Sequence, residues 1–154
     1  MLSTRGGPGE PSAIEDLVRW GMRTSTLRIE THGRLAHDVT DRVAGFAAEQ
    51  VGDGLLHVFV AHATAGVALM ETGSGSESDL EHLLERIFPR DDRYAHRHGS
   101  VGHGGDHLVP VFVSPSLVLP VLDGTVQLGT WQSVVLVDPN RENDLRTVRL
   151  SFVA

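Results

Sequence analysis

The C-terminal third of the chain alternates apolar segments with turn residues, and this pattern is the strongest constraint on the fold. Residues 116–121 and 125–137 have the composition of strands and flank Asp123-Gly124, a dipeptide that favours the tight turn of a β-hairpin. Gly129 interrupts the second segment and predicts a bulge there. Residues 145–153 form a further apolar segment. Strands joined by hairpins predict a largely antiparallel sheet.

The rest of the chain adds helices to these strands. Apolar alternation predicts strands over 24–31, 55–61 and 65–71. Helices are expected after Ser12-Ala13-Ile14-Glu15, from Asp38 or Thr40 to about Gln50, and from the capping box Ser78-Asp79-Leu80-Glu81 to Pro89. The predicted fold class is therefore α+β, with a largely antiparallel sheet and two or three helices.

Length and composition limit the organisation of the chain and its partners. The 154 residues are expected to form one domain over 14–154, after a disordered tail over 1–13 that is rich in Gly, Pro and Ser. The net charge of −7 argues against nucleic-acid binding. The sequence has no apolar run near the roughly 20 residues that span a bilayer, no hydrophobic signal core and no cysteine. We therefore expect a cytoplasmic protein without a membrane partner.

A glycine-rich segment over 94–107 carries the residues that suggest chemistry. It contains four histidines, His96, His98, His103 and His107. Imidazole is a ligand for zinc, iron and similar ions, and it titrates near neutral pH. The alternative is a solvated, histidine-rich surface loop. His103 and His107 have the i, i+4 spacing of ligands on a helix, but the glycines between them make a helix doubtful.

Other polar residues lie at the ends of predicted strands or within them. His62 and Thr64 follow the apolar strand 55–61, and Glu71 ends the next one. Trp131 and Gln132 follow Gly129; the tryptophan is either a core residue or an aromatic wall for a flat ligand, with Gln132 supplying hydrogen bonds. Further candidates are Asp79, in the first turn of a predicted helix, and Arg146 and Arg149, which face opposite sides of the last strand, so that one can hold phosphate.

In order and spacing these segments resemble the YjbQ family, whose members are described as secondary thiamine-phosphate synthases. The resemblance covers about residues 24–153. The matching blocks are 38–40, 62–65 with Glu71, 79–80, 94–96, 107–108 and the most specific one, DGTVQLGTWQ over 123–132.

The resemblance implies a barrel-like α+β fold, a homotrimer and a polar site that uses His62, Glu71, His96, His107 and the Trp131-Gln132 segment. The chain departs from the family pattern at several positions. Met70 stands where Asn is usual, Gly105 replaces a histidine often found two residues before His107, and Asp144 replaces a usual arginine. Residues 109–111 include Pro110 and replace a helix-like stretch, since proline is disfavoured inside a helix.

The leading hypothesis is therefore an enzyme that joins a pyrimidine pyrophosphate to a thiazole phosphate with loss of pyrophosphate. His62, His96 and His107 would bind a divalent ion, Zn or Mg, or the phosphate. Glu71 or Asp79 would act as a base or orient a histidine, with Thr64 as a further catalytic residue. Trp131, Gln132 and Arg146 would bind the substrate. The alternatives are a metal-dependent hydrolase of a phosphoester or amide, and a non-catalytic trimer that binds a metal or small ligand.

Overall fold

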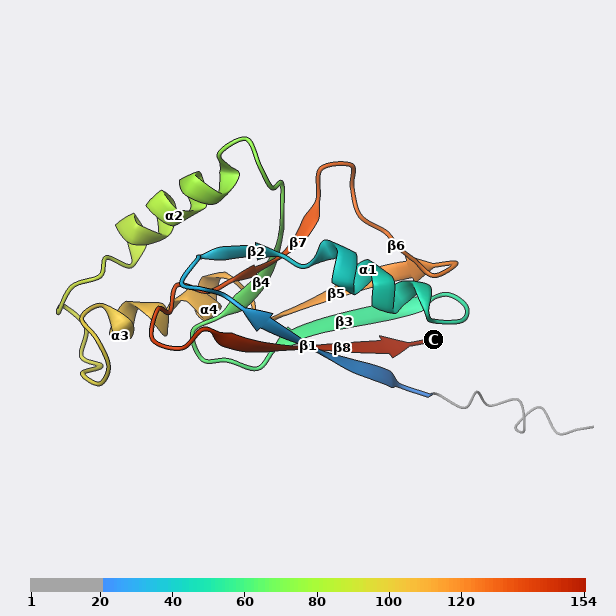
Figure 1. Ribbon diagram of the computed structural model, residues 1–154, viewed down its shortest axis with the longest axis horizontal. Coiled ribbons are helices and arrows are strands. Elements are labelled where there is room, and N and C mark those ends of the chain that lie inside the picture. Colours follow the sequence, from blue (N-terminus) through green and yellow to red (C-terminus); the bar gives the residue numbers. More distant parts are fainter. Residues whose placement is uncertain (1–20) are drawn as a thin grey trace, which may run out of the picture.

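The computed structural model describes residues 21–154, which contain eight strands and four helices (Figure 1). The strands are β1 (Arg23–Glu30), β2 (Ala36–Asp38), β3 (Gly54–Val60), β4 (Gly66–Met70), β5 (Ser116–Leu122), β6 (Thr125–Val126), β7 (Ser133–Val137) and β8 (Leu145–Val153). The helices are α1 (Thr40–Ala48), α2 (Ser76–Ile87) and the single turns α3 (His103–Asp106) and α4 (Val109–Phe112). The expected tail over 1–13 and the helix after Ser12 lie outside the described residues.

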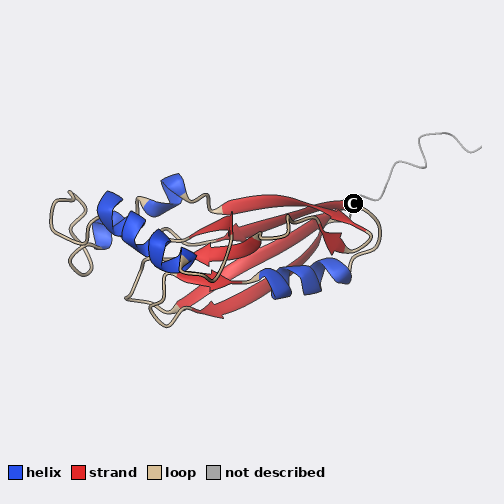
Figure 2. Cartoon of the chain, turned by 90° about the horizontal axis from the view of Figure 1, so that it is seen from above, coloured by secondary structure: helices blue, strands red, loops and turns tan. Residues whose placement is uncertain are grey.

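The strands form two antiparallel sheets that curl into an incomplete barrel (Figure 2). One sheet has the order β1-β8-β3-β5-β6, and the other has the order β2-β7-β4. The predicted α+β class with a largely antiparallel, barrel-like sheet is therefore confirmed. No helix of residues 21–154 has both the length and the apolar character needed to cross a bilayer.

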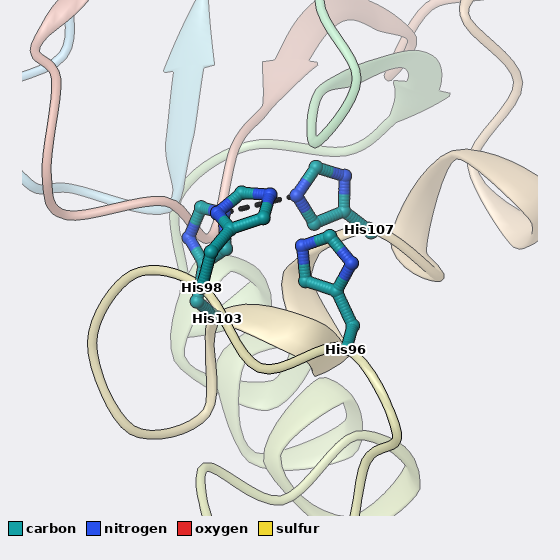
Figure 3. Close-up of side chains that lie close together, drawn as sticks. All are labelled: His96, His98, His103 and His107. Carbon is teal, nitrogen blue, oxygen red and sulfur yellow. Dashed lines mark hydrogen bonds between the residues drawn. The ribbon is translucent and has the colours of Figure 1, made fainter.

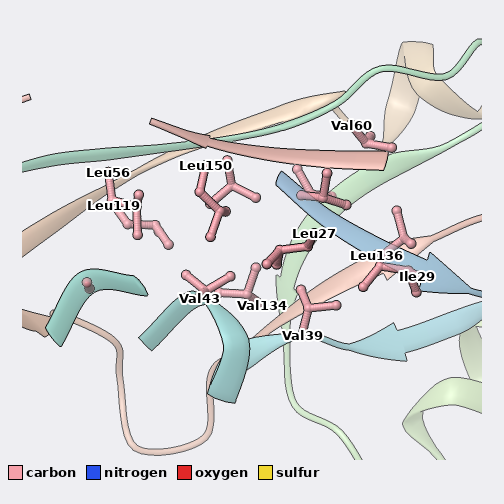
Figure 4. Close-up of a cluster of buried hydrophobic side chains, with 14 of the residues drawn as sticks. Leu27, Ile29, Val39, Val43, Leu56, Val60, Leu119, Val134, Leu136 and Leu150 are labelled. Carbon is pink, nitrogen blue, oxygen red and sulfur yellow. The ribbon is translucent and has the colours of Figure 1, made fainter. Parts of the chain in front are cut away.

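The main core lies between the two sheets and α1 (Figure 4). Strict alternation places Leu56, Val58 and Val60 of β3 inside, as a strand with one buried face requires. In contrast, all four residues of Val134–Val137 in β7 are fully buried. Val134 and Leu136 face the main core, whereas Val135 and Val137 pack against a second core under α2 and α4. Burial on both faces explains why this segment is continuously apolar.

The hairpin predicted at Asp123-Gly124 is confirmed. Leu122 pairs with Thr125, and both turn residues have positive φ angles, 47° for Asp123 and 70° for Gly124. A two-residue turn with two positive φ angles matches the right-handed twist of the strands that it joins. Glycine tolerates this conformation because it has no Cβ.

The single long strand predicted over 125–137 is wrong. It is divided into β6 and β7 by residues 127–132, which form no strand. The amide of Gly129 donates to Oε1 of Gln132 at 2.8 Å, and Trp131 is 74% exposed. The interpretation of Trp131 as a core residue beside a bulge is therefore also wrong. The apolar pattern of the segment could not reveal the break because Leu128 packs on the core from the loop.

The start predicted for α2 is three residues too late. Helix α2 begins at Ser76 after Gly75, whose φ of 98° is typical of glycine, and no side chain caps it. Instead the Glu77 carboxylate accepts a hydrogen bond from the Gly73 amide. The predicted end is confirmed, since the helix stops at Ile87, before Pro89.

Two helical turns appear where the sequence argued against them. Helix α3 contains Gly104 and Gly105, and a Cβ built on either residue would lie 2.6 Å or 2.8 Å from the side chain of Tyr94. The glycines are therefore explained by close packing with Tyr94, which outweighs their low helix propensity. Helix α4 contains Pro110 in its first turn, where the missing N–H breaks no helical hydrogen bond.

This packing predicts opposite effects for two glycine-to-alanine substitutions. Gly104→Ala is expected to lower the free energy of unfolding by about 1–3 kcal/mol, because the new methyl group overlaps Tyr94. A Cβ added at Gly45, in α1, would meet nothing within 4 Å. Gly45→Ala is therefore expected to raise the free energy of unfolding by about 0.5–1 kcal/mol. Urea unfolding of both variants measures the difference; equal shifts in the same direction would contradict it.

Candidate metal centre

Four imidazole rings gather beside α3 (Figure 3), which lies at the end of the molecule away from the C-terminus (Figure 1). They belong to His96, His98, His103 and His107, and one nitrogen of each lies within 4.8 Å of the corresponding nitrogen of every other. We call these residues the imidazole cluster. Within it, the Nε2 atoms of His103 and His107 lie 2.9 Å apart.

The cluster depends on α3 and on the loop between α2 and α3. His103 begins α3 and His107 follows its last residue with helical backbone angles, so the i, i+4 spacing places both rings on one side. His96 and His98 lie in the preceding loop, which forms no strand. The Tyr94 ring packs against α3, and its hydroxyl donates to the Pro89 carbonyl at 3.0 Å. Tyr94 thereby holds the loop against the helix.

The donor set suits a transition-metal ion. Zinc–nitrogen distances are about 2.0–2.1 Å, so the nitrogens of a tetrahedral site lie roughly 3.3 Å apart. The Nε2 atoms of His103 and His107 lie 2.9 Å apart, and the ligand atoms of all four residues lie within 4.8 Å of one another, so small movements of the rings would reach this spacing. A neutral imidazole nitrogen is also the form that binds a metal.

The surroundings favour that neutral form. Partial burial, followed by the charges of His103, His96, His98 and His62, lowers the pKa of His107. Desolvation, with smaller contributions from His98 and His103, also lowers the pKa of His96. Like charges repel, so the rings oppose each other's protonation.

Behind the cluster, the turn after β7 supplies groups that orient His103. Nδ1 of His103 lies 3.4 Å from Oε2 of Glu142 and 3.4 Å from Nδ2 of Asn140. The other oxygen of Glu142 accepts a short hydrogen bond from the Ser100 amide, which lowers the pKa of Glu142. A carboxylate at Nδ1 leaves Nε2 free as a metal ligand. The sequence did not predict these roles of Asn140 and Glu142, since nothing in it indicates contact with His103.

The arrangement predicts a measurable role for Glu142. Glu142→Ala is expected to weaken Zn²⁺ binding about 10–100-fold, because the orientation and basicity of His103 depend on the carboxylate. Competition with a chromophoric chelator at neutral pH measures the dissociation constant. Glu85→Ala, which removes an exposed carboxylate of α2, is the matched control. An unchanged affinity in Glu142→Ala would show that the carboxylate does not support the site.

A buried polar network lies next to the cluster. Nδ1 of His62 is 2.9 Å from Oγ1 of Thr64, which donates to Oδ1 of Asp138 at 3.1 Å. Oδ2 of Asp138 lies 2.6 Å from Nε of Arg146, and both side chains are fully buried. Burial, with a smaller contribution from Arg146, lowers the pKa of His62.

This network places three residues of the predicted site, His62, Thr64 and Arg146, beside the cluster rather than in it. The ligands expected from the sequence were His62, His96 and His107; the structure joins the last two with His98 and His103, while His62 contacts Thr64. The two arginines of β8 face opposite sides as predicted, with Arg149 exposed and Arg146 inside. Phosphate binding by Arg146 would require its pair with Asp138 to open.

The remaining predicted site residues lie at the far end of β7. Trp131 and Gln132 precede this strand, whereas Asp138 follows it, and five residues of strand span roughly 17 Å. Glu71 lies at the same far end, because Met70 pairs with Ser133. Asp79 is exposed in the first turn of α2, which follows. Within one chain, the structure therefore separates these four residues from the imidazole cluster.

Comparisons with known proteins place the chain in a family. The family model described as UPF0047 protein YjbQ-like matches residues 25–154. A UPF0047 protein of Mycobacterium tuberculosis is 57% identical over 132 residues, which cover 86% of this chain and 98% of that protein. The YjbQ protein of Escherichia coli O157:H7 is 32% identical over 120 residues, covering 76% of this chain and 86% of that protein.

Solved structures agree with this assignment at the level of the fold. A YbjQ-like protein of unknown function from Sulfolobus solfataricus P2 superposes with a TM-score of 0.82 at 22% identity, covering 88% of this chain and 99% of that one. A hypothetical protein from Aeropyrum pernix K1 has a TM-score of 0.77 at 30% identity, covering 84% and 97%. With the family model matched over nearly all the described residues, the chain belongs to the UPF0047 YjbQ-like family.

Proposed function

We propose that the imidazole cluster binds a divalent transition metal and that the chain is a metal-dependent enzyme acting on a small phosphorylated substrate. The observation that carries this proposal is the convergence of four imidazole nitrogens within 4.8 Å. Their surroundings support it, because His103 is buried and oriented by Glu142 while His96 and His98 are open to solvent. One side of the cluster is thus fixed and the other is accessible.

The donor set distinguishes between the two ions expected from the sequence. Magnesium prefers oxygen ligands in an octahedral arrangement, whereas imidazole suits zinc, iron, nickel and copper. The cluster has four imidazoles and no carboxylate among its members. We therefore infer zinc, or a similar transition metal, rather than magnesium.

The chemistry follows from charge. A bound divalent ion supplies Lewis-acid character, which neutralises a phosphate or pyrophosphate oxygen as negative charge develops on it. His103 and His107 would hold the ion from the protein side, and Glu142 would keep His103 in the right orientation. The exposed side, at His96 and His98, is where a phosphorylated substrate would approach.

The specific reaction implied by the resemblance is synthesis of thiamine phosphate from a pyrimidine pyrophosphate and a thiazole phosphate. The cluster supports it through its capacity to stabilise a pyrophosphate leaving group. Trp131, the expected wall for the pyrimidine, lies at the far end of β7 in the same chain. This reaction would therefore need the Trp131 of a second copy. Hydrolysis needs no such wall, and exposure of His96 and His98 to water favours it as the second candidate.

Metal analysis and turnover test these proposals together. Untagged protein is expected to contain zinc or to bind it with a stoichiometry near one per chain. The protein is then supplied with Zn²⁺, Mn²⁺ or Mg²⁺ and tested with the two thiamine precursors and with a generic phosphomonoester. Thiamine phosphate supports the synthase, and release of inorganic phosphate supports the hydrolase. Metal binding without turnover on either substrate would instead identify a non-catalytic binding protein.

We also propose that the chain assembles as a homotrimer. The outer face of the larger sheet supports this, because it carries exposed apolar side chains, with Leu55 53%, Val118 58% and Leu122 47% exposed. Apolar surface on adjacent strands is typical of an interface between subunits. Sedimentation equilibrium measures the mass, and Val118→Asp is expected to yield monomers. A monomeric wild-type protein would contradict the proposal.

A further inference from the structure

The imidazole cluster contains one histidine more than an open metal site requires. A structural zinc site has four protein ligands, whereas a catalytic site has three and keeps a position for water or substrate. Four converging histidines would close a tetrahedral site and leave no place for a substrate oxygen. The four side chains differ, however, in how firmly the fold holds them.

Two of the histidines are held in place by contacts with the rest of the fold. His103 is 6% exposed, and its Nδ1 faces Glu142 and Asn140. Its Nε2 lies 2.9 Å from Nε2 of His107, one turn later along α3. The amide of Leu108, next to His107, donates to the Gly105 carbonyl at 3.0 Å. Moving either ring requires the helical turn or its contacts to change.

His96 is held less directly, through its backbone. A Cβ built on Gly104 would lie 3.2 Å from the His96 carbonyl oxygen, so the loop backbone touches α3 at this point. Tyr94, two residues earlier, packs against the same helix. The His96 ring is exposed, and its centroid lies 4.5 Å from that of His107.

His98, like His96, is held less firmly than His103 and His107. Its ring is exposed, and its centroid is 5.9 Å from that of His107, the largest separation in the cluster. Among the hydrogen bonds of residues 21–154, none involves the His98 ring. The next residue, Gly99, is held against the cluster, since a Cβ built on it would lie 2.8 Å from the His103 ring. Release of His98 from a metal is therefore a rotation of its exposed side chain and not a movement of the loop backbone.

We propose that His98 is an exchangeable fourth ligand of the metal centre. In the absence of another ligand it completes a closed four-histidine site. When a small anion or a phosphate oxygen binds, His98 leaves and the anion takes its position, while His96, His103 and His107 remain. This proposal rests on the metal binding proposed above and adds to it the residue that controls access to the metal.

Cobalt(II) is a spectroscopic probe for this exchange, since its visible absorption reports the number and type of ligands. Wild type, His98→Ala and His98→Gln are titrated with Co²⁺ and then with azide. Both variants are expected to bind Co²⁺ within about tenfold of wild type, a difference of about 1.4 kcal/mol. Their azide affinity is expected to be at least about tenfold higher, because no imidazole competes for the position. His82→Ala, an exposed histidine of α2, is the matched control.

Each result decides a separate question. Loss of Co²⁺ binding in both His98 variants, with unchanged circular dichroism, would show that His98 is a permanent ligand and would overturn the proposal. Equal azide affinities and spectra in wild type and both variants would show that His98 is not a ligand. Failure of the wild-type protein to bind Co²⁺ or Zn²⁺ would overturn the proposed function itself, before any variant is considered.

Discussion

Replacing His103 with alanine is expected to weaken Zn²⁺ binding by at least about 100-fold, or about 2.8 kcal/mol. His103 contributes one ligand atom to the site and also connects the cluster to the turn after β7. Its Nε2 faces His107, and its Nδ1 connects the cluster to Glu142 and Asn140. The substitution therefore removes a donor and also leaves the supporting carboxylate without its partner.

Competition with a chromophoric chelator measures the affinity, and thermal unfolding with and without Zn²⁺ gives an independent readout. A ligand that binds only the folded state raises the melting temperature, so wild type is expected to show a zinc-dependent rise that His103→Ala lacks. His32→Ala is the matched control, because His32 is an exposed histidine outside the cluster. Equal zinc affinities in His103→Ala and wild type would show that the imidazole cluster is not the metal site and would contradict the proposed function.

Replacing Asp138 with asparagine is expected to destabilise the fold by about 3–5 kcal/mol, because it leaves the buried guanidinium of Arg146 without a counter-charge. Both side chains are fully buried, and Nε of Arg146 lies 2.6 Å from Oδ2 of Asp138. Asparagine keeps the approximate shape of aspartate and can still accept the hydrogen bond from Thr64. The loss of charge therefore dominates the effect. Asp123→Asn, in the exposed hairpin turn, is the matched control and is expected to change stability by about 0.5 kcal/mol or less.

Urea unfolding of metal-free protein measures both variants, so that the metal does not contribute. The double variant Arg146→Met with Asp138→Asn is expected to recover much of the loss, since no uncompensated charge then remains. A double variant less stable than Asp138→Asn would show that Arg146 contributes chiefly through its other contacts, which are with Leu145 and Asn143. An Asp138→Asn variant as stable as wild type would contradict the argument outright.

Local chemistry explains which elements the sequence predicted correctly. The Asp123-Gly124 turn depends on the φ angles that two adjacent residues tolerate, and Pro89 ends α2 through its missing N–H. In both cases the cause lies within a few residues. The errors arose where distant contacts decided the outcome. Tyr94 packs against Gly104 and Gly105 and makes them suitable for a helix, although their own propensity argues against it.

The candidate site shows the same division between local and distant causes. The sequence identified the histidine-rich segment because four imidazoles are close together in the chain. It did not predict which imidazoles converge. His62 was expected as a ligand with His96 and His107, but it contacts Thr64 instead. The sequence also missed Glu142, which reaches His103 from 39 positions away by the fold of the turn after β7. Spacing along the chain does not encode that contact.

By itself, the sequence determined the α+β class, the antiparallel hairpins and the segment that bears the imidazoles, because periodicity and turn chemistry act over a few residues. The tertiary structure alone decided that β7 is buried on both faces, that Asp138 pairs with Arg146, and that Trp131 and the imidazole cluster lie at opposite ends of one strand. These features depend on packing between segments far apart in the chain. The register of the sheets sets the distances between those segments.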